Sequence, residues 1–308
     1  MQAAKCFAKA AVADISNLQI HQRRCELLES MGAHNELLQA CLTMLRGVQP
    51  GTEDGLEWVK VAQHIACIHY GQGNYSSARR ALSNALFKCS DYFTMENYHL
   101  LLELQIITKH YIGVIKVLSN HLGVVFDRAI VDDLDIEDAV TMELTKTLPL
   151  DILSKLCVAL IHLKKLDMAL PVVAMLLDSD VEDYGDVYLD LAEAMAEQLY
   201  HSDALVLFEK LVHSHKFSMP AVWLKYADSL VAVDRIEDSI VGYRNVIKLA
   251  PAHEEARLRL AELLQKLGKV IIGRARKFML LKMTKYGLKN MLLCSKNSDI
   301  CSCNQNTV

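Results

Sequence analysis

The chain has 308 residues, 52% of them hydrophobic, and a formal net charge of −4, so it can bury a sizeable core but has no overall positive field to hold nucleic acid. Its five prolines and 13 glycines are too few for the many turns of an all-β fold. Nine scattered cysteines are typical of reduced thiols in an intracellular protein. No run of about 18 uncharged apolar residues occurs, and we therefore expect no membrane partner.

In chain order, helical segments recur, and a small or apolar residue marks the start of the second helix of each predicted pair. Most steps between the markers are close to the period of about 34 residues seen in helical repeat arrays. Because the first marker lies at residue 3, we expect the chain to begin inside a repeat, as a fragment or with an incomplete first pair. The markers are Ala3, Leu37, Ala78, Val114, Ala169, Ala204 and Ser239.

The longest step, from Val114 to Ala169, contains an acidic segment at 126–148. We predict that this segment is a linker between upstream helical repeats at 1–125 and downstream repeats at 149–268. The alternative is an acidic docking segment for a basic partner. The acidic residues are Asp127, Asp132, Asp133, Asp135, Glu137, Asp138 and Glu143.

The clearest repeat lies at 220–253, where the order of aromatic, small and proline positions is that of a tetratricopeptide repeat. Small residues at Ala227 and Ser239 allow two antiparallel helices to approach closely, and Pro251 cannot continue a helix. We therefore predict an all-α fold, a right-handed tetratricopeptide-type solenoid of about seven antiparallel helix pairs. The expected packing residues are Ala204, Phe208, Trp223, Tyr243 and Pro251.

Beyond Pro251 the pattern predicts a first helix at 254–268, but its second helix does not follow. We interpret 269–308 as a basic, divergent and partly disordered tail. Its segment 269–289 contains basic residues and no acidic one. That segment would either shield the last apolar face of the solenoid or touch nucleic acid or a membrane surface.

No motif for catalysis is present, since the sequence lacks a Gly-rich phosphate loop, a nucleophile elbow and a His-Glu-x-x-His motif. We expect neither enzymatic activity nor a cofactor. Two groups of possible metal ligands occur, and no metal site is predicted from either. The histidines, at i and i+2 near a helix end, point to different sides, and the cysteines have no second ligand pair at zinc-finger spacing. These groups are His213 with His215, and Cys294 with Cys301 and Cys303.

The outward faces of the last three predicted first helices are acidic. In tetratricopeptide arrays the first helix of each pair lines the binding groove, and stacked carboxylates there would favour a Lys- and Arg-rich or helical segment of a partner. The alternative is that these are ordinary solvated helix charges. The predicted groove residues are Asp186, Glu193, Glu197, Asp228, Glu255 and Glu262.

Several segments resemble the tetratricopeptide-repeat subunits of general transcription factor IIIC, and the similarity runs over roughly 1–268. This resemblance implies a nuclear, non-enzymatic scaffold of the RNA polymerase III machinery that bridges promoter-bound subunits to initiation factor IIIB. It implies other subunits of factors IIIC and IIIB as partners, with mainly indirect contact to DNA. The segments are CFAKAAVADISN (6–17), MEN (95–97), GDVYLDLAEAMAE (185–197), AVWLKYADSL (221–230) and GYRNVIKLAPAHEEARLRLAELLQKLG (242–268).

The alternative function is that of a generic intracellular tetratricopeptide adaptor or co-chaperone. A groove that binds a C-terminal carboxylate needs several Lys and Arg side chains on its first helices. Because the predicted groove positions are mainly acidic, the sequence favours the transcription scaffold over this adaptor.

Overall fold

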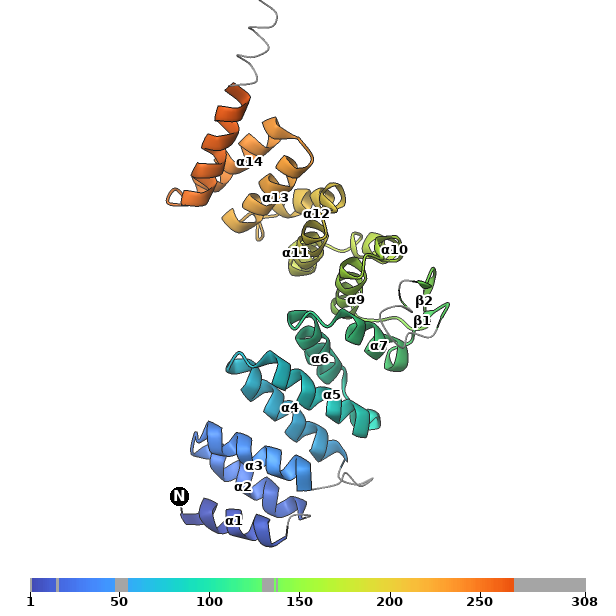
Figure 1. The fold of residues 1–308 in the computed structure, drawn as a ribbon, viewed down its shortest axis with the longest axis vertical. Helices are drawn as coiled ribbons and strands as arrows, with labels where there is room; N and C mark the ends of the chain where they lie inside the picture. The colour runs from blue at the N-terminus through green and yellow to red at the C-terminus, as the bar shows by residue number, and fades with distance from the viewer. Residues whose placement is uncertain (1, 15–16, 48–54, 129–135, 137, 269–308) are drawn as a thin grey trace, which may run out of the picture. The chain divides into compact units, whose positions relative to one another are not determined.

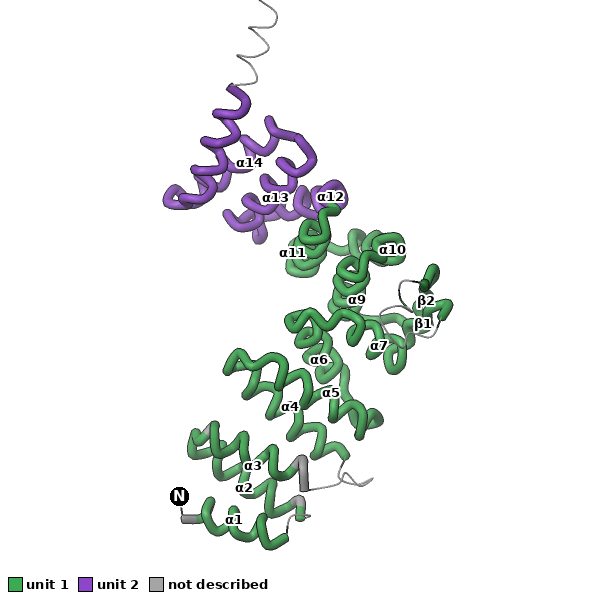
Figure 2. The backbone as a smooth tube through the Cα atoms, viewed as in Figure 1, with its two compact units in different colours: residues 1–200 green, residues 201–308 purple. Residues whose placement is uncertain are grey.

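The computed structural model describes residues 2–14, 17–47, 55–128, 136 and 138–268, and all structural statements concern these residues (Figure 1). The chain divides into two compact units, residues 1–200 and 201–308, which are described separately (Figure 2). The predicted tail at 269–308, with the basic segment 269–289, Cys294, Cys301 and Cys303, lies outside the described residues.

Unit 1 consists mainly of helices in sequential pairs. Within it α2 packs against α3, α4 against α5, α6 against α7 and α9 against α10. Its helices are α1 (Gln2–Ala13), α2 (Leu18–Ser30), α3 (His34–Gly47), α4 (Gly55–Gly71), α5 (Tyr75–Lys88), the 3-10 turn η1 (Ser90–Tyr92), α6 (Met95–Ile107), α7 (Tyr111–His121), α9 (Leu150–His162), α10 (Leu166–Leu176) and α11 (Val181–Glu197).

Unit 2 continues the alternation of first and second helices. It contains α12 (His201–His213), α13 (Pro220–Ala232) and α14 (Ile236–Leu249), followed by a helix at 254–268. The antiparallel pair α13 and α14 packs closely, and Ala227, Tyr243 and Val246 form its buried centre. The all-α, tetratricopeptide-type solenoid predicted from the sequence is thereby confirmed.

The turn between the first and second helix of each pair has a constant geometry. Each turn holds one residue with positive φ, two positions before the second helix begins. In the turn after α9, Lys165 N–H donates to the Leu160 carbonyl and Lys164 N–H to the Ile161 carbonyl, which is the Schellman pattern that ends a helix. The positive-φ residues are Gly32, Gly73, Lys109, Lys164, Leu199 and Asp234.

The predicted phase of the repeats agrees with the second helices of both units. Six of the seven markers are the fourth residue of a second helix, and all six are buried. The exception is Ala3, which is exposed on α1, whereas its neighbour Ala4 is buried. The marker of the first helix was therefore assigned one position too early.

The acidic insertion contains a short β-ribbon. Strands β1 (Val124–Phe126) and β2 (Met142–Leu144) pair antiparallel, with Val124 opposite Leu144. The Asp127 carboxylate accepts a hydrogen bond from Val140 N–H at 3.2 Å. The ribbon includes residues 126 and 142–144 of the segment 126–148, which is predicted to be a linker and of which residues 129–135 and 137 are not described.

The helices on either side of the insertion are in contact. α9, which follows the insertion, packs against both α6 and α7, which precede it. The division between compact units falls after Tyr200. The insertion therefore interrupts the sequence period but not the packing of successive helix pairs.

The expected packing residues of unit 2 differ in their burial. Ala204, Phe208 and Tyr243 are almost completely inaccessible to solvent, as expected for groups between helices. Trp223 is only half-buried, packs edge-on against Tyr226, and donates its indole N–H to Ser218 Oγ at 3.0 Å. Pro251 is exposed in the bend that follows α14. In the part of the chain that the structure describes, no helix is long and apolar enough to cross a membrane.

Candidate functional site

Figure 1 shows α6, α9 and α11, which are three successive first helices of unit 1. Residues of these helices line a recess with a volume of about 240 Å³. Helix α9 packs against both of the others and contributes Ser154, Lys155, Val158 and His162 to the lining. Four carboxylates and two lysines line it, which leaves an excess of negative charge. The charged lining residues are Glu103, Lys109, Lys155, Asp190, Glu193 and Glu197.

Lys155 on α9 is a buried lysine, with only 8% of its side chain exposed. Its Nζ lies 2.9 Å from Glu103 Oε2 on α6. A buried ammonium is costly unless a carboxylate compensates it, so this ion pair fixes Lys155 inside the recess. Lys155 therefore neutralises Glu103 and cannot fully compensate the carboxylates of α11.

Asp190 on α11 shows the effect of that excess charge. Burial raises the pKa of Asp190 to about 6, and the neighbouring Glu103, Glu193 and Asp186 carboxylates add to this rise while Lys155 opposes it. The side chain is exposed by surface area, but protein atoms around the recess displace much of its surrounding water. A cation placed beside Asp190 would stabilise its ionised form.

His162 contributes an aromatic surface rather than a positive charge. Its ring stacks on Tyr111 with 4.2 Å between the centroids and 9° between the planes. Burial lowers the pKa of His162, although Glu197 partly opposes this, so the imidazole is neutral at pH 7. Its Nδ1 is hydrogen-bonded to Gln198 Nε2 at 3.0 Å, and its Nε2 lies 3.9 Å from Glu197 Oε2.

The predicted groove residues of α11 lie partly in this recess. Glu193 and Glu197 line it, whereas Asp186 is exposed on the same helix outside the lining. Asp190 was missed from the sequence, although its spacing from Asp186 and Glu193 places all three on one helical face. Glu103 was also missed, because its position depends on the packing of α6 against α9.

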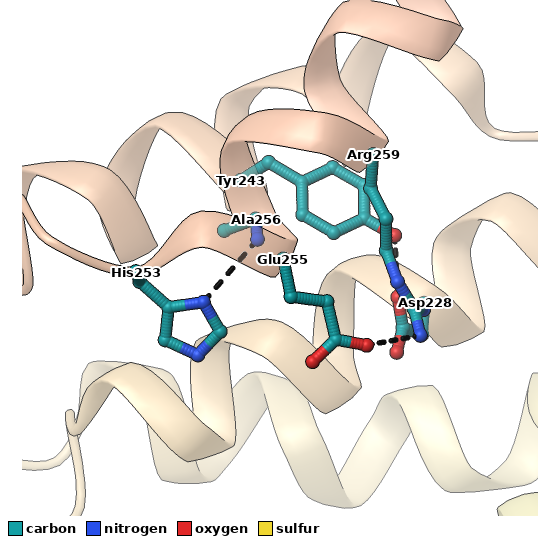
Figure 3. Close-up of polar contacts among 6 residues, drawn as sticks. All are labelled: Asp228, Tyr243, His253, Glu255, Ala256 and Arg259. Carbon is teal, nitrogen blue, oxygen red and sulfur yellow. Dashed lines mark hydrogen bonds and ion pairs between the residues drawn. The ribbon is translucent and has the colours of Figure 1, made fainter.

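The predicted groove residues of unit 2 are arranged differently, as Figure 3 shows. Asp228 on α13 accepts hydrogen bonds from the Tyr243 hydroxyl and from the Arg259 guanidinium. Arg259 also donates to Glu255 Oε1 at 2.6 Å. Two of the three predicted carboxylates are therefore compensated within the unit, and Glu262 remains exposed beside them.

This network also joins two successive first helices of unit 2, because Asp228 belongs to α13 and Arg259 to the helix at 254–268. Burial raises the pKa of Tyr243, and its hydrogen bond to the Asp228 carboxylate raises it further. Tyr243 therefore remains a neutral donor at pH 7. The network stabilises packing and offers less uncompensated charge than the recess of unit 1.

The residues weighed as metal ligands do not come together within the described chain. His213 Nδ1 is hydrogen-bonded to the Glu209 carbonyl at 2.7 Å, one turn earlier on α12, and His215 is exposed. Among the described residues there is no group of three or more His, Cys, Asp or Glu side chains that could hold a metal ion.

A search of protein-family models gave no match. The human protein named general transcription factor 3C polypeptide 3 is 30% identical to this chain over 272 residues, which cover 87% of this chain and 30% of that protein.

Similar solved structures are tetratricopeptide-repeat proteins with low sequence identity. The C-terminal part of one from Cytophaga hutchinsonii is 16% identical, covers 83% of this chain and 92% of its own, and has a TM-score of 0.47. A thermophilic one from Thermus thermophilus is 14% identical, covers 67% and 99%, and has a TM-score of 0.42. By its own helix pairs the chain is a tetratricopeptide-type repeat protein, and it resembles the human factor IIIC subunit over 87% of its length.

Proposed function

We propose that the chain is a protein-binding scaffold whose first helices hold cationic segments of partner proteins. The observation that carries this proposal is the recess between α6, α9 and α11, where four carboxylates face two lysines. Lys155 is already paired with Glu103, and His162 is neutral at pH 7. The remaining negative charge favours a Lys or Arg side chain over an anionic group.

The dimensions and chemistry of the recess suit one long cationic side chain. A volume of about 240 Å³ accepts a single side chain rather than a folded element. The stacked rings of Tyr111 and His162 provide a flat surface beside the carboxylates, and a guanidinium group packs well on such a surface. Arginine is therefore the preferred residue, and its binding would release the proton that Asp190 holds near pH 6.

Our proposal for the identity of the partners is based on the human relative. The human relative is a polypeptide of general transcription factor 3C. We infer that this chain assembles in the nucleus with other subunits of transcription factor IIIC and helps to bridge promoter-bound subunits to initiation factor IIIB. In this role its contact with DNA is mainly indirect, and it needs no catalytic residue, cofactor or membrane.

A generic adaptor or co-chaperone is the second candidate function. Such a protein binds a C-terminal carboxylate through unpaired cations on its first helices. Within unit 1 the central cation, Lys155, is buried and paired, and within unit 2 Arg259 is paired with two carboxylates. Neither cation is available to an anionic peptide without breaking an internal ion pair, which favours the transcription scaffold.

The proposal is tested by pull-down from nuclear extract with the full chain and the double variant Glu193→Gln/Glu197→Gln. The matched control is Asp203→Asn/Glu209→Gln, which removes two carboxylates from the second helix α12. At low salt, loss of two partly exposed charge pairs lowers partner affinity by about three- to tenfold. We expect factor IIIC and IIIB subunits to be captured by the unchanged chain and the control, and to be depleted with the recess variant.

The possible outcomes test the identity of the partner and the location of its binding site independently. Capture of these subunits with equal yield by all three proteins would contradict the recess as the docking site. Capture of chaperones in place of the transcription subunits would favour the adaptor. Circular dichroism of each variant ensures that a lost interaction does not reflect a lost fold.

A further inference from the structure

Two cysteines of the first helix pair lie in direct contact. The Sγ atoms of Cys25 on α2 and Cys41 on α3 are 3.4 Å apart. Cys41 is buried, with 2% exposure, and Cys25 is half-buried at the edge of the same apolar cluster, which includes Leu28 and Leu37. The paired helices therefore hold the two thiols together on separate elements.

We propose that Cys25 and Cys41 are a dithiol modification site, which closes to a disulfide when it reacts with a peroxide. A disulfide bond is about 2.05 Å long, so the two sulfur atoms need to approach by only about 1.4 Å. Small side-chain rotations in a helix pair supply such a movement. Among the described residues both cysteines are free of disulfides, and neither belongs to a group of side chains that could hold a metal ion.

The two thiols are not equivalent, which sets the order of reaction. The hydrogen bond from Cys41 lowers the pKa of Cys25, and this effect outweighs the opposing effect of burial. The same hydrogen bond and the burial of Cys41 raise the pKa of Cys41. Cys25 is also the more accessible of the two. It is therefore the thiol that ionises and meets the oxidant first.

The reaction balances in two steps. The Cys25 thiolate attacks one oxygen of hydrogen peroxide, an S–O bond forms, the O–O bond breaks, and the departing hydroxide takes up a proton to become water. Cys41 sulfur then attacks Cys25 sulfur, the S–S bond forms and the S–O bond breaks. The Cys41 proton leaves with the departing hydroxide as a second water. The sulfur pair loses two electrons, and the peroxide gains them.

The disulfide would covalently join α2 to α3 within unit 1. A cross-link between paired helices restricts their separation in the unfolded chain and so favours the paired state. The site is independent of the proposed partner recess, since none of the recess residues lies on α2 or α3. Its failure would leave the proposed function untouched.

The sequence offers a direct assay. Trypsin cleaves after Arg24 and Arg46, and no Lys or Arg lies between them, so Cys25 and Cys41 fall in the single peptide 25–46. The reduced full chain is treated with increasing hydrogen peroxide, its remaining thiols are alkylated, and the digest is measured by mass spectrometry. We expect the peptide to lose two hydrogen atoms and both alkylation sites while the exposed Cys67 is still largely alkylated.

Variants and a second reagent control the interpretation. Cys25→Ser and Cys41→Ser should each abolish the lighter peptide, whereas Cys67→Ser should leave it unchanged. Phenylarsine oxide, which bridges two neighbouring thiols without oxidising them, should bind the unchanged chain and protect peptide 25–46 from alkylation. In urea, where the helices separate, the same peroxide treatment should lose its preference for this pair.

A doubly alkylated peptide 25–46 at a peroxide dose that has already oxidised Cys67 would overturn the proposal. So would a disulfide from Cys25 to any other cysteine in place of Cys41. If both serine variants fail to fold by circular dichroism, the comparison of folded and urea-treated unchanged chain decides the question, since equal oxidation in both states would also overturn it.

Discussion

Gly242 on α14 lies directly against Ala227 on α13, and adding a methyl group at Gly242 should separate the two helices. A Cβ atom at this position would lie 2.8 Å from the Ala227 Cβ and 3.4 Å from the Ala227 Cα. Neither contact can be relieved by a side-chain rotation, because both Cβ atoms are fixed by their backbones. The substitution Gly242→Ala must therefore move α14 away from α13 and loosen the cluster around Tyr243.

Two opposing effects set the size of the change. Replacing glycine by alanine in a helix interior stabilises the helix by about 1 kcal/mol. Overpacking a close helix contact costs about 1–3 kcal/mol. We therefore expect Gly242→Ala to lower the free energy of unfolding of unit 2 by about 1 kcal/mol. The control is Gly71→Ala at the end of α4, where no atom lies within 4 Å of the new Cβ, and its stability should be unchanged or higher.

The free energy of unfolding of both variants is measured by urea unfolding, monitored by circular dichroism. A double-mutant cycle then isolates the contact between residues 227 and 242. Ala227→Gly removes the opposing methyl group, so the double variant Ala227→Gly/Gly242→Ala regains the space that the single variant lost. The two changes should therefore be coupled by about 1–2 kcal/mol, with the double variant more stable than the sum of the singles predicts. Additive effects would refute the close approach of the two helices.

The other predictions use the same measurement. Leu199 is 78% exposed and has a φ of 67°, so Leu199→Gly should stabilise the chain by about 0.5–1 kcal/mol, while Leu199→Ala should not. The pKa of Asp190 in the folded chain, about 6, exceeds its value in the unfolded chain, so the free energy of unfolding falls as the pH rises from about 4 to 6. Asp190→Asn should remove this fall without altering stability at pH 4. Trp223 is half-buried, so Trp223→Ala should cost about 2 kcal/mol, less than a fully buried tryptophan; an effect above that of Tyr243→Ala would contradict its placement.

The phase of the repeats could be predicted because it rests on a steric requirement that the sequence displays. The fourth residue of each second helix from α3 onward is buried, and it is small or apolar as the predicted pattern requires. The turns are harder to predict. Gly32 and Gly73 signal a left-handed residue, whereas Lys109, Lys164 and Leu199 adopt the same φ because the flanking helices impose it.

The β-ribbon at Val124–Phe126 and Met142–Leu144 was missed for a different reason. Each strand has only three residues, and strands this short are defined by their pairing rather than by a period in the sequence. The two ion pairs of Arg259 show a similar limit, because only a contact within one helix can be predicted from sequence spacing. Glu255 and Arg259 lie one helical turn apart and could have been paired from the sequence, whereas the contact of Asp228 with Arg259 depends on how two helices pack.

The predicted groove carboxylates of unit 2 and those of the unit 1 recess differ in their internal contacts. This difference decides at which of them a charge-changing substitution gives an interpretable result. Changing Asp228 to a lysine would place it against Arg259 and remove the acceptor of the Tyr243 hydroxyl, so it would disturb the packing of unit 2 as well as its charge. A lost interaction in that variant would not distinguish binding from folding. Glu193 and Glu197 line a recess whose own cation, Lys155, is held by Glu103 on another helix. Neutralising these two carboxylates leaves that ion pair in place, and a lost partner would then report on the recess itself.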